Sequence, residues 1–268
     1  MKKTMAMTGA LLLAASGNTW AACSDISWDA LNAAVAKAAA ASTGGYSLKM
    51  WATVTDESGV VCWVTTNGNP GAAAGNSAWL GSRVISAQKA NTAGAFSLDG
   101  YAISTGNLYS AVQPGGSLFG LQESNPVDTR VAYAGNANNF GTKNDPLRGK
   151  RIGGINVFGG GLALYSADGK TKIGALGVSG DTSCRDHAFA WNIRKTLNMQ
   201  PGGVGAATVN LNAAGVPQTP LTGATVGDEL ILSNTPNGSS SYWDAWSQPY
   251  CPNSIPAATA ANGTLIAP

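Results

Sequence analysis

The sequence is poor in the side chains that most catalytic and metal-binding sites use. Among 268 residues there is one histidine, His187, and only 11% of the residues are charged. A Ser-His-Asp triad or a zinc site would have to use this one imidazole, and zinc would need two further ligands besides His187 and Cys184. The G-x-S-x-G motif of a serine nucleophile and the C-x-x-C-H motif of covalent haem attachment are both missing.

An excess of one charge sign and long apolar runs are also missing. Without the two lysines of an N-terminal leader, 14 basic residues face 14 acidic ones, so we expect no surface for nucleic acid or an anionic membrane. Beyond the first residues, no segment approaches the ~20 continuous apolar residues of a transmembrane helix. The expected partner is a small molecule, with no nucleic acid and no membrane span.

The N-terminus has the pattern of a secretory signal peptide. Two lysines precede an apolar run from Met5 to Ser16, and small residues around Ala21 offer a cleavage site. The run is too short to cross a bilayer, so we expect residues 1–21 to be removed and the protein to be secreted or periplasmic. The remaining 247 of the 268 residues suffice for one domain, residues 22–200, and an extension over 201–268.

Four cysteines remain after this cleavage, Cys23, Cys62, Cys184 and Cys251. In an exported protein, four cysteines predict two disulfides, and three connectivities are open. The sequence does not choose among them. We favour Cys23–Cys62 with Cys184–Cys251, because the second bridge would pin the extension to the domain; free reactive thiols are the alternative.

Periodicity and turn signals predict an α+β fold. Hairpins that are separated by helices indicate an antiparallel sheet with helices packed on it, here followed by an irregular C-terminal extension. Helices are expected at 27–42, 82–96, 104–113 and 183–197. Strands are expected at 47–55, 60–66, 154–165, 172–179 and 229–233, with polar, turn-rich loops at 67–77 and 117–150.

The last of these helices begins beside the main candidate functional residues. Ser183 followed by Asp186 predicts a capping box, in which each side chain accepts the other's backbone N–H, and Asp181 is an alternative N-cap. His187 has no such structural role, and a neutral imidazole is a common ligand of haem iron. Paired with Asp186 or Asp181, His187 would also support the proton transfer of a lyase or isomerase.

Three motifs in combination resemble the GlcG/HbpS-type haem-binding (haem-degrading domain) family. They are the turn with Asp56 and Gly59, the Lys-Ala-x-Thr-Ala pattern within 88–96, and Gly153-Gly154 followed by Ile173–Gly180 and an acidic residue. The likeness covers about residues 27–198. It implies a profilin-like sandwich, homo-oligomers, and binding of haem or, less often, of a corrinoid or iron.

Together, the resemblance and the residues predict an exported haem- or tetrapyrrole-binding protein that is not an enzyme. His187 is the expected axial ligand of the iron, with Tyr101 and Tyr109 as alternative oxygen ligands, and Phe96 or Trp191 is expected to stack on the macrocycle. The positions matched to the family are Lys89, Thr92, Gly177, Ser179, Gly180 and Asp186. The alternatives are a lyase or isomerase that uses an Asp/His pair in the same pocket, and a structural oligomer without a ligand.

Overall fold

The computed structural model describes residues 21–41, 44–71, 81–211, 217–218, 224–234, 245–251 and 264–266. Nearly all of the expected signal peptide and much of the C-terminal extension lie outside these residues.

Two β-hairpins form the central sheet. Strand β1 (Trp51–Asp56) pairs with β2 (Val61–Thr66), and β3 (Gly161–Tyr165) pairs with β4 (Lys172–Ser179). The hairpins join through β1 and β4, so the antiparallel order is β2-β1-β4-β3. The register places Trp51 opposite Ser179. The predicted α+β fold on an antiparallel sheet is therefore confirmed.

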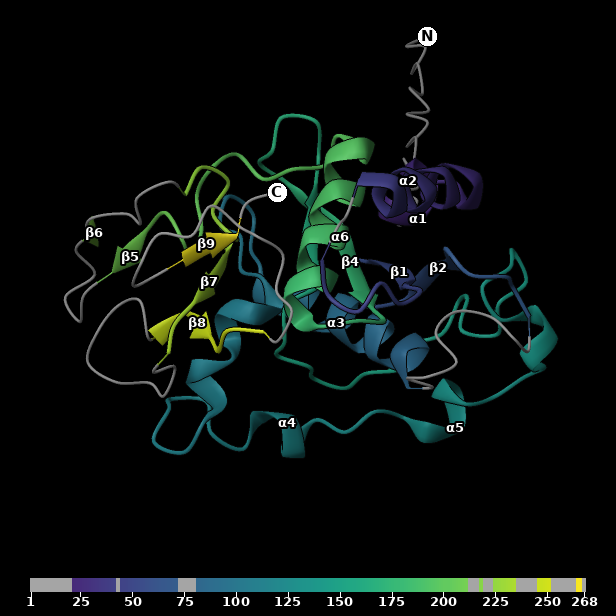
Figure 1. The fold of residues 1–268 in the computed structure, drawn as a ribbon, viewed down its shortest axis with the longest axis horizontal. Helices are drawn as coiled ribbons and strands as arrows, with labels where there is room; N and C mark the ends of the chain where they lie inside the picture. Colours follow the sequence, from purple (N-terminus) through teal and green to yellow (C-terminus); the bar gives the residue numbers. More distant parts are fainter. Residues whose placement is uncertain are drawn as a thin grey trace, which may run out of the picture.

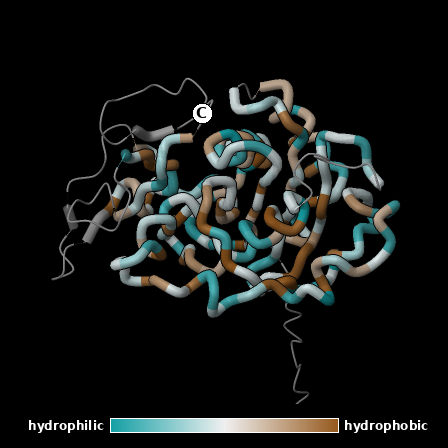
Figure 2. The backbone as a smooth tube through the Cα atoms, turned by 60° about the horizontal axis from the view of Figure 1, so that its bottom comes forward, coloured by the Kyte–Doolittle hydropathy of each residue, from teal (hydrophilic) through white to brown (hydrophobic). Residues whose placement is uncertain are grey.

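Helices cover both faces of this sheet (Figure 1). On one face lie α1 (Ala21–Asp25), α2 (Trp28–Ala41) and α6 (Ser183–Leu197), and on the other lies α3 (Ser82–Phe96). Hydrophobic segments run through the centre of the molecule (Figure 2). The α2/α6 face holds the larger core, which includes Leu31, Val54, Leu176 and Phe189, and the α3 face holds a second one, which includes Val64, Val84 and Ala87.

Helix α3 approaches the sheet very closely because β4 carries a glycine at the crossing point. A Cβ atom on Gly177 would lie 1.9 Å from the carbonyl oxygen of Ser86 and 2.4 Å from the backbone nitrogen of Ala90. The Thr53 and Ser86 hydroxyls, 2.7 Å apart, add a buried hydrogen bond between β1 and α3. This contact fixes the position of α3, which carries Lys89.

Three of the expected elements are shorter than predicted. The strand expected at 47–55 begins only at Trp51. The helix expected at 104–113 is two 3-10 turns, η1 (Thr105–Leu108) and η2 (Ser110–Val112). The strand expected from residue 154 begins only at Gly161, because positive φ angles at Gly153, Gly154 and Gly160 bend the preceding chain. The long connection between η2 and β3 contains the short helices α4 (Leu121–Ser124), α5 (Thr129–Ala132) and η3 (Ala137–Asn139).

The chain after α6 returns to cover the end of the domain. Strand β7 (Leu230–Leu232) pairs in parallel with β8 (Ser247–Gln248) and antiparallel with β9 (Thr264–Ile266), which confirms the expected strand at 229–233. A separate pair is formed by β5 (Asn210–Leu211) and β6 (Pro217–Gln218). Residues 224–234 and 245–251 are called the strap below.

Both favoured cysteine pairings are confirmed. Cys23–Cys62, the hairpin disulfide, ties α1 to β2, and Cys184–Cys251, the strap disulfide, ties the start of α6 to the strap. Within the described ranges, every helix is too short or too polar to cross a bilayer.

Candidate functional site

A pocket of about 380 Å³ opens where β4 ends and α6 begins. One wall comes from α3, the floor from the end of β4 and the start of α6, and the opposite side from the chain that precedes β3. We call it the sheet-end pocket. Its lining consists of Gly81, Ser82, Ile85, Lys89, Asn156, Phe158, Ser179, Asp181, Ser183 and Asp186.

A buried ion pair occupies one wall of the sheet-end pocket. The Lys89 ammonium donates to Asp186 Oδ2 at 2.8 Å and to the Val178 carbonyl at 3.1 Å, and the two charged side chains are only 2% and 3% exposed. Burial raises the pKa of Asp186 to about 6, against the opposing effect of the Lys89 charge. A carboxyl group at the pocket wall therefore changes its charge near neutral pH.

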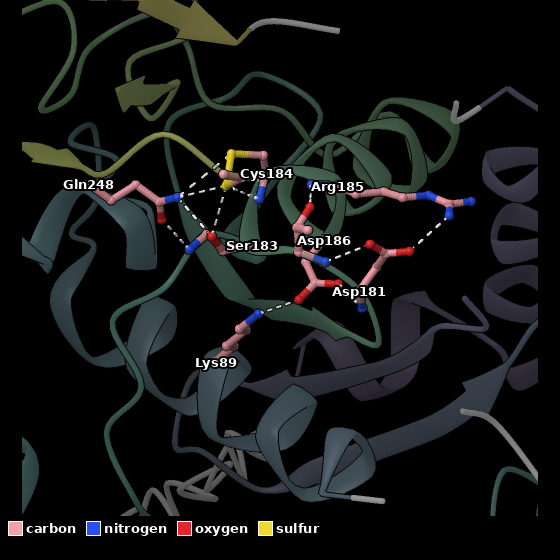
Figure 3. The surroundings of a disulfide bond; sticks show 10 residues. Lys89, Asp181, Ser183, Cys184, Arg185, Asp186 and Gln248 are labelled. Atoms are coloured by element: carbon pink, nitrogen blue, oxygen red, sulfur yellow. Dashed lines mark hydrogen bonds and ion pairs between the residues drawn. A yellow bond between two sulfur atoms is a disulfide. The ribbon is translucent and has the colours of Figure 1, made fainter. Parts of the chain in front are cut away.

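The capping box predicted for α6 is wrong. Thr182, not Ser183, is the N-cap, and its hydroxyl accepts the backbone N–H of Arg185 at 3.3 Å. Asp186 Oδ1 instead accepts the backbone N–H of Asp181 at 2.9 Å, which leaves its other oxygen for Lys89 (Figure 3). Because Thr182, one residue before Ser183, provides the cap, the Asp186 carboxylate is not needed there and lines the pocket instead.

Asp181 is not the N-cap either; it anchors the chain that precedes β1. Its carboxylate accepts backbone N–H groups of Tyr46 at 2.8 Å and Leu48 at 2.9 Å, and it pairs with the Arg185 guanidinium at 3.0 Å. Because Tyr46 and Leu48 lie more than 130 residues before Asp181, these bonds hold residues 46–48 against the start of α6. Its role in this structure is to shape the pocket.

His187 lies one residue beyond Asp186 but is buried on another side of the helix. Its side chain has no exposed surface, and neither ring nitrogen has a hydrogen-bond partner among the described residues. Burial, together with the Arg194 and Lys89 charges, lowers the pKa of His187 to about 3. The imidazole is therefore neutral, packs 5.9 Å from the Trp191 ring, and forms no pair with either aspartate.

A second pocket of about 340 Å³, the strap pocket, adjoins the first. The two share Phe158 and Ser183, and we call them together the groove. Phe158 is 44% exposed and contacts the Tyr109 ring at a centroid distance of 5.7 Å. The remaining lining is Tyr46, Thr182, Gln248, Pro249, Tyr250 and Cys251, so the strap supplies one wall.

Gln248 fixes this wall to the domain. Its side-chain oxygen accepts the backbone N–H of Gly159 at 2.8 Å, and its amide nitrogen donates to the Ser183 hydroxyl at 2.8 Å, beside the strap disulfide (Figure 3). Both ends of the amide are therefore used to position the strap on the groove.

The groove brings together five of the predicted residues: Lys89, Ser179, Asp181 and Asp186 line the sheet-end pocket, and Tyr109 lines the strap pocket. The others lie elsewhere. Thr92 links Gln88 to the chain at Asn156, and Tyr101 donates to the Val209 carbonyl. Phe96 packs in the cluster that also contains Tyr109 but lines neither pocket, and Trp191 belongs to the main core.

Sequence reasoning expected an extension pinned through Cys251 but missed the aromatic wall and the strap residues that complete the groove. Tyr46, Gln248 and Tyr250 lie outside the expected elements, and Phe158 lies in the expected strand 154–165, at a position where the structure has irregular chain. The predicted strap disulfide was the one signal that placed the chain near Cys251 beside Ser183.

The groove combines apolar ring faces at one end with an ammonium beside two carboxylates at the other. Phe158 and Tyr109 offer apolar ring faces, phenolate oxygen is a known type of haem-iron ligand, and Lys89 supplies a cation at the other end. Within the described ranges, three or more His, Cys, Asp or Glu side chains do not gather at any point where a bare metal ion would bind.

Comparison with known proteins identifies the family. No curated protein matches the chain. Among solved structures, Klebsiella pneumoniae protein ORFY is 26% identical, with a TM-score of 0.42, and covers 64% of this chain and 90% of its own. The PduOC:haem complex is 23% identical, with a TM-score of 0.41, and covers 64% and 91%. Residues 24–193, well over half of the chain, match the model for the haem degrading protein HbpS-like family. The chain therefore belongs to the HbpS-like family.

Proposed function

We propose that this protein is exported and binds haem or a related tetrapyrrole in the groove, without chemically changing it. Family membership supports the ligand class. The observation that carries the location is the aromatic wall shared by two adjoining pockets, each within the ~300–1,000 Å³ typical of small-molecule sites.

In this proposal the macrocycle lies against Phe158, and Tyr109 supplies an oxygen ligand to the iron. The Lys89 ammonium has three donors, of which Asp186 and the Val178 carbonyl take two. The third would meet a carboxylate of the ligand. Because Asp186 already compensates the Lys89 charge, this contact would be a charge-assisted hydrogen bond rather than attraction to a free cation.

Export and self-association are parts of the same proposal. Two disulfides support an oxidising compartment, because such bonds are rare in reducing ones. The family resemblance supports a homo-oligomer, which size-exclusion chromatography with light scattering would test directly.

The test is a titration of the purified, disulfide-intact protein with hemin, followed through the Soret band. We expect a saturable shift near one equivalent and an altered band in Tyr109→Phe, which removes only the phenol oxygen. Tyr133→Phe is the matched control, because Tyr133 is 64% exposed and lines neither pocket. A wild-type protein that gives the spectrum of free hemin throughout would refute haem binding.

One observation favours a second function, proton transfer on a small substrate. Asp186 has a pKa of about 6 at the pocket wall, which suits a general acid or base near neutral pH. The partner would be Lys89 rather than His187, because Lys89 makes the contact. Exchange of the α-protons of small keto acids in deuterated water, followed by NMR, would detect this activity; Asp186→Asn should abolish it, whereas exposed Asp168→Asn should not.

A further inference from the structure

The strap covers one face of α6 and is anchored at both ends of that face. Cys184, His187, Trp191 and Arg194 follow one another at steps of three and four residues, so they share this face. At one end Cys184 forms the strap disulfide. At the other, the Arg194 guanidinium makes two hydrogen bonds to Asp228, at 2.6 and 2.7 Å, and both side chains are fully buried.

His187 lies between these two anchors. A Cβ atom placed on Gly159 would lie 3.1 Å from the Cβ of His187 and 3.2 Å from Leu230 Cδ1, so the strap and the chain before β3 close over this turn of α6. Leu230 and Leu232 also form a small apolar cluster with Cys184. This cluster is separate from the main core, on which the strap packs through Val226, so the apolar contacts of the strap nearest His187 are those of Leu230 and Leu232.

Neither ring nitrogen of His187 has a partner among the described residues, although the strap beside it is well bonded. The buried Glu229 carboxylate accepts three backbone N–H groups of residues 225–227 at 2.6 to 2.8 Å. The Asn107 amide donates to the Glu229 carbonyl at 3.0 Å. A fully buried imidazole with two unpaired nitrogens is unusual beside such a network and points to a role that the covered state does not use.

We propose that the strap is a releasable cover and that His187 is a ligand-binding residue held beneath it, available to haem iron only when the strap is displaced. The role of His187 as a haem ligand rests on the proposed haem binding, whereas the role of the strap as a cover does not. Because Gln248 and Tyr250 belong to the strap, displacement would also remove one wall of the groove. The covered and uncovered proteins would thus bind a tetrapyrrole differently.

The single histidine makes the cover measurable without any haem. Full-length protein carrying a tag without histidine is treated with diethyl pyrocarbonate, and the modification of His187 is followed by mass spectrometry. We expect wild-type protein to be protected and Cys184→Ser/Cys251→Ser to react at least about tenfold faster. Closure of a 67-residue loop by the disulfide disfavours opening of the strap by a factor of roughly 10³, so a tenfold faster reaction is well within this limit. Leu230→Ala, which loosens the strap but keeps the disulfide, should react at an intermediate rate.

Cys23→Ser/Cys62→Ser is the matched control, because it removes a disulfide on the opposite side of the domain and should leave His187 protected. Equal protection in the wild type, the strap variants and this control would overturn the cover. Equal reactivity in the control and the strap variants would also overturn it, because general loosening would then explain the labelling.

Hemin titration of the strap-disulfide variant tests the ligand role. We expect a Soret band different from that of the wild type, and we expect His187→Gln in the same background to abolish the difference. Identical spectra with and without His187 would overturn the ligand role. If no variant binds hemin, the haem-binding function fails and the ligand role with it, whereas the labelling still decides whether the strap is a cover.

Discussion

Replacing His187 should remove a pH dependence of stability that the fold itself creates. The folded-state pKa of about 3 lies below the ordinary value of 6.5, so between these values the unfolded chain binds a proton that the folded chain does not. The free energy of unfolding therefore falls as the pH decreases below 6.5. The contribution of neutral, buried His187 is fully present above pH 6.5 and is lost progressively toward pH 3.

The size of the effect follows from linkage. Each pH unit well between the two pKa values changes the free energy of unfolding by about 1.4 kcal/mol, so acidification from pH 6.5 to 4.5 should cost about 2 kcal/mol. Asp186 acts in the opposite direction. Its pKa of about 6 lies above the ordinary 3.8, so its contribution to stability falls as the pH rises through that range. The difference between variant and wild type cancels this second effect.

The assay is urea unfolding at several pH values between 7 and 4.5, with the disulfides intact. His187→Gln keeps a polar side chain but does not titrate, and His187→Leu also removes the two unpaired nitrogens. Both variants should lose stability less steeply than the wild type on acidification. Only the leucine variant should also gain about 1–3 kcal/mol at pH 7, the usual cost of burying unsatisfied polar groups. Parallel pH profiles of the wild type and both variants would refute a neutral, buried imidazole.

Three further perturbations test other parts of the structure. Lys89→Met leaves the Asp186 carboxyl without its buried partner and should lower the free energy of unfolding in urea by about 3–5 kcal/mol. The double variant Lys89→Met/Asp186→Leu should recover most of this loss, and the absence of such a rescue would contradict the pairing. Gly177→Ala places a methyl group 1.9 Å from a backbone oxygen of α3 and should cost at least ~1–3 kcal/mol, whereas Gly81→Ala, with its nearest atom at 3.5 Å, should stay within ~0.5 kcal/mol. Removing the strap disulfide should cost ~4 kcal/mol from loop closure over 67 residues, and an unchanged thermal midpoint would contradict this contribution of the bridge.

The elements that the sequence predicts well are those whose pattern is local. The hairpin around Asp56 and the helix at 82–96 follow from the residues of each segment itself, and the helix has the predicted bounds, whereas the first strand begins at Trp51 rather than at residue 47. The turns at 105–112 are set from a distance instead. A Cβ on Gly106 would lie 2.3 Å from Leu230, and Asn107 bonds to a carbonyl 122 residues away, so local propensity favoured a helix that the tertiary contacts replace.

The residues of the candidate site also fall into two groups, those that local patterns predict and those that distant contacts bring into place. Lys89, Ser179, Asp181 and Asp186 belong to regular elements or lie beside their ends, and all but Asp181 are positions matched to the family. Exposure of His187 depends on whether a distant segment covers its face of α6, and no sequence pattern near residue 187 predicts this coverage. The aromatic wall depends likewise on loops that meet only in three dimensions.

The two disulfides also decide where this domain is able to come apart. One bridge ties its first helix to β2, and the other ties its last helix to the strap, so fraying from either end of the domain is blocked covalently. Fraying ends are ordinarily the first part of a fold to open. Among the described segments, the connection through α4 and η3, two short helices without a buried residue, is then the place where opening begins. A protease that acts on the native protein should make its first cut there, and the two fragments should remain associated.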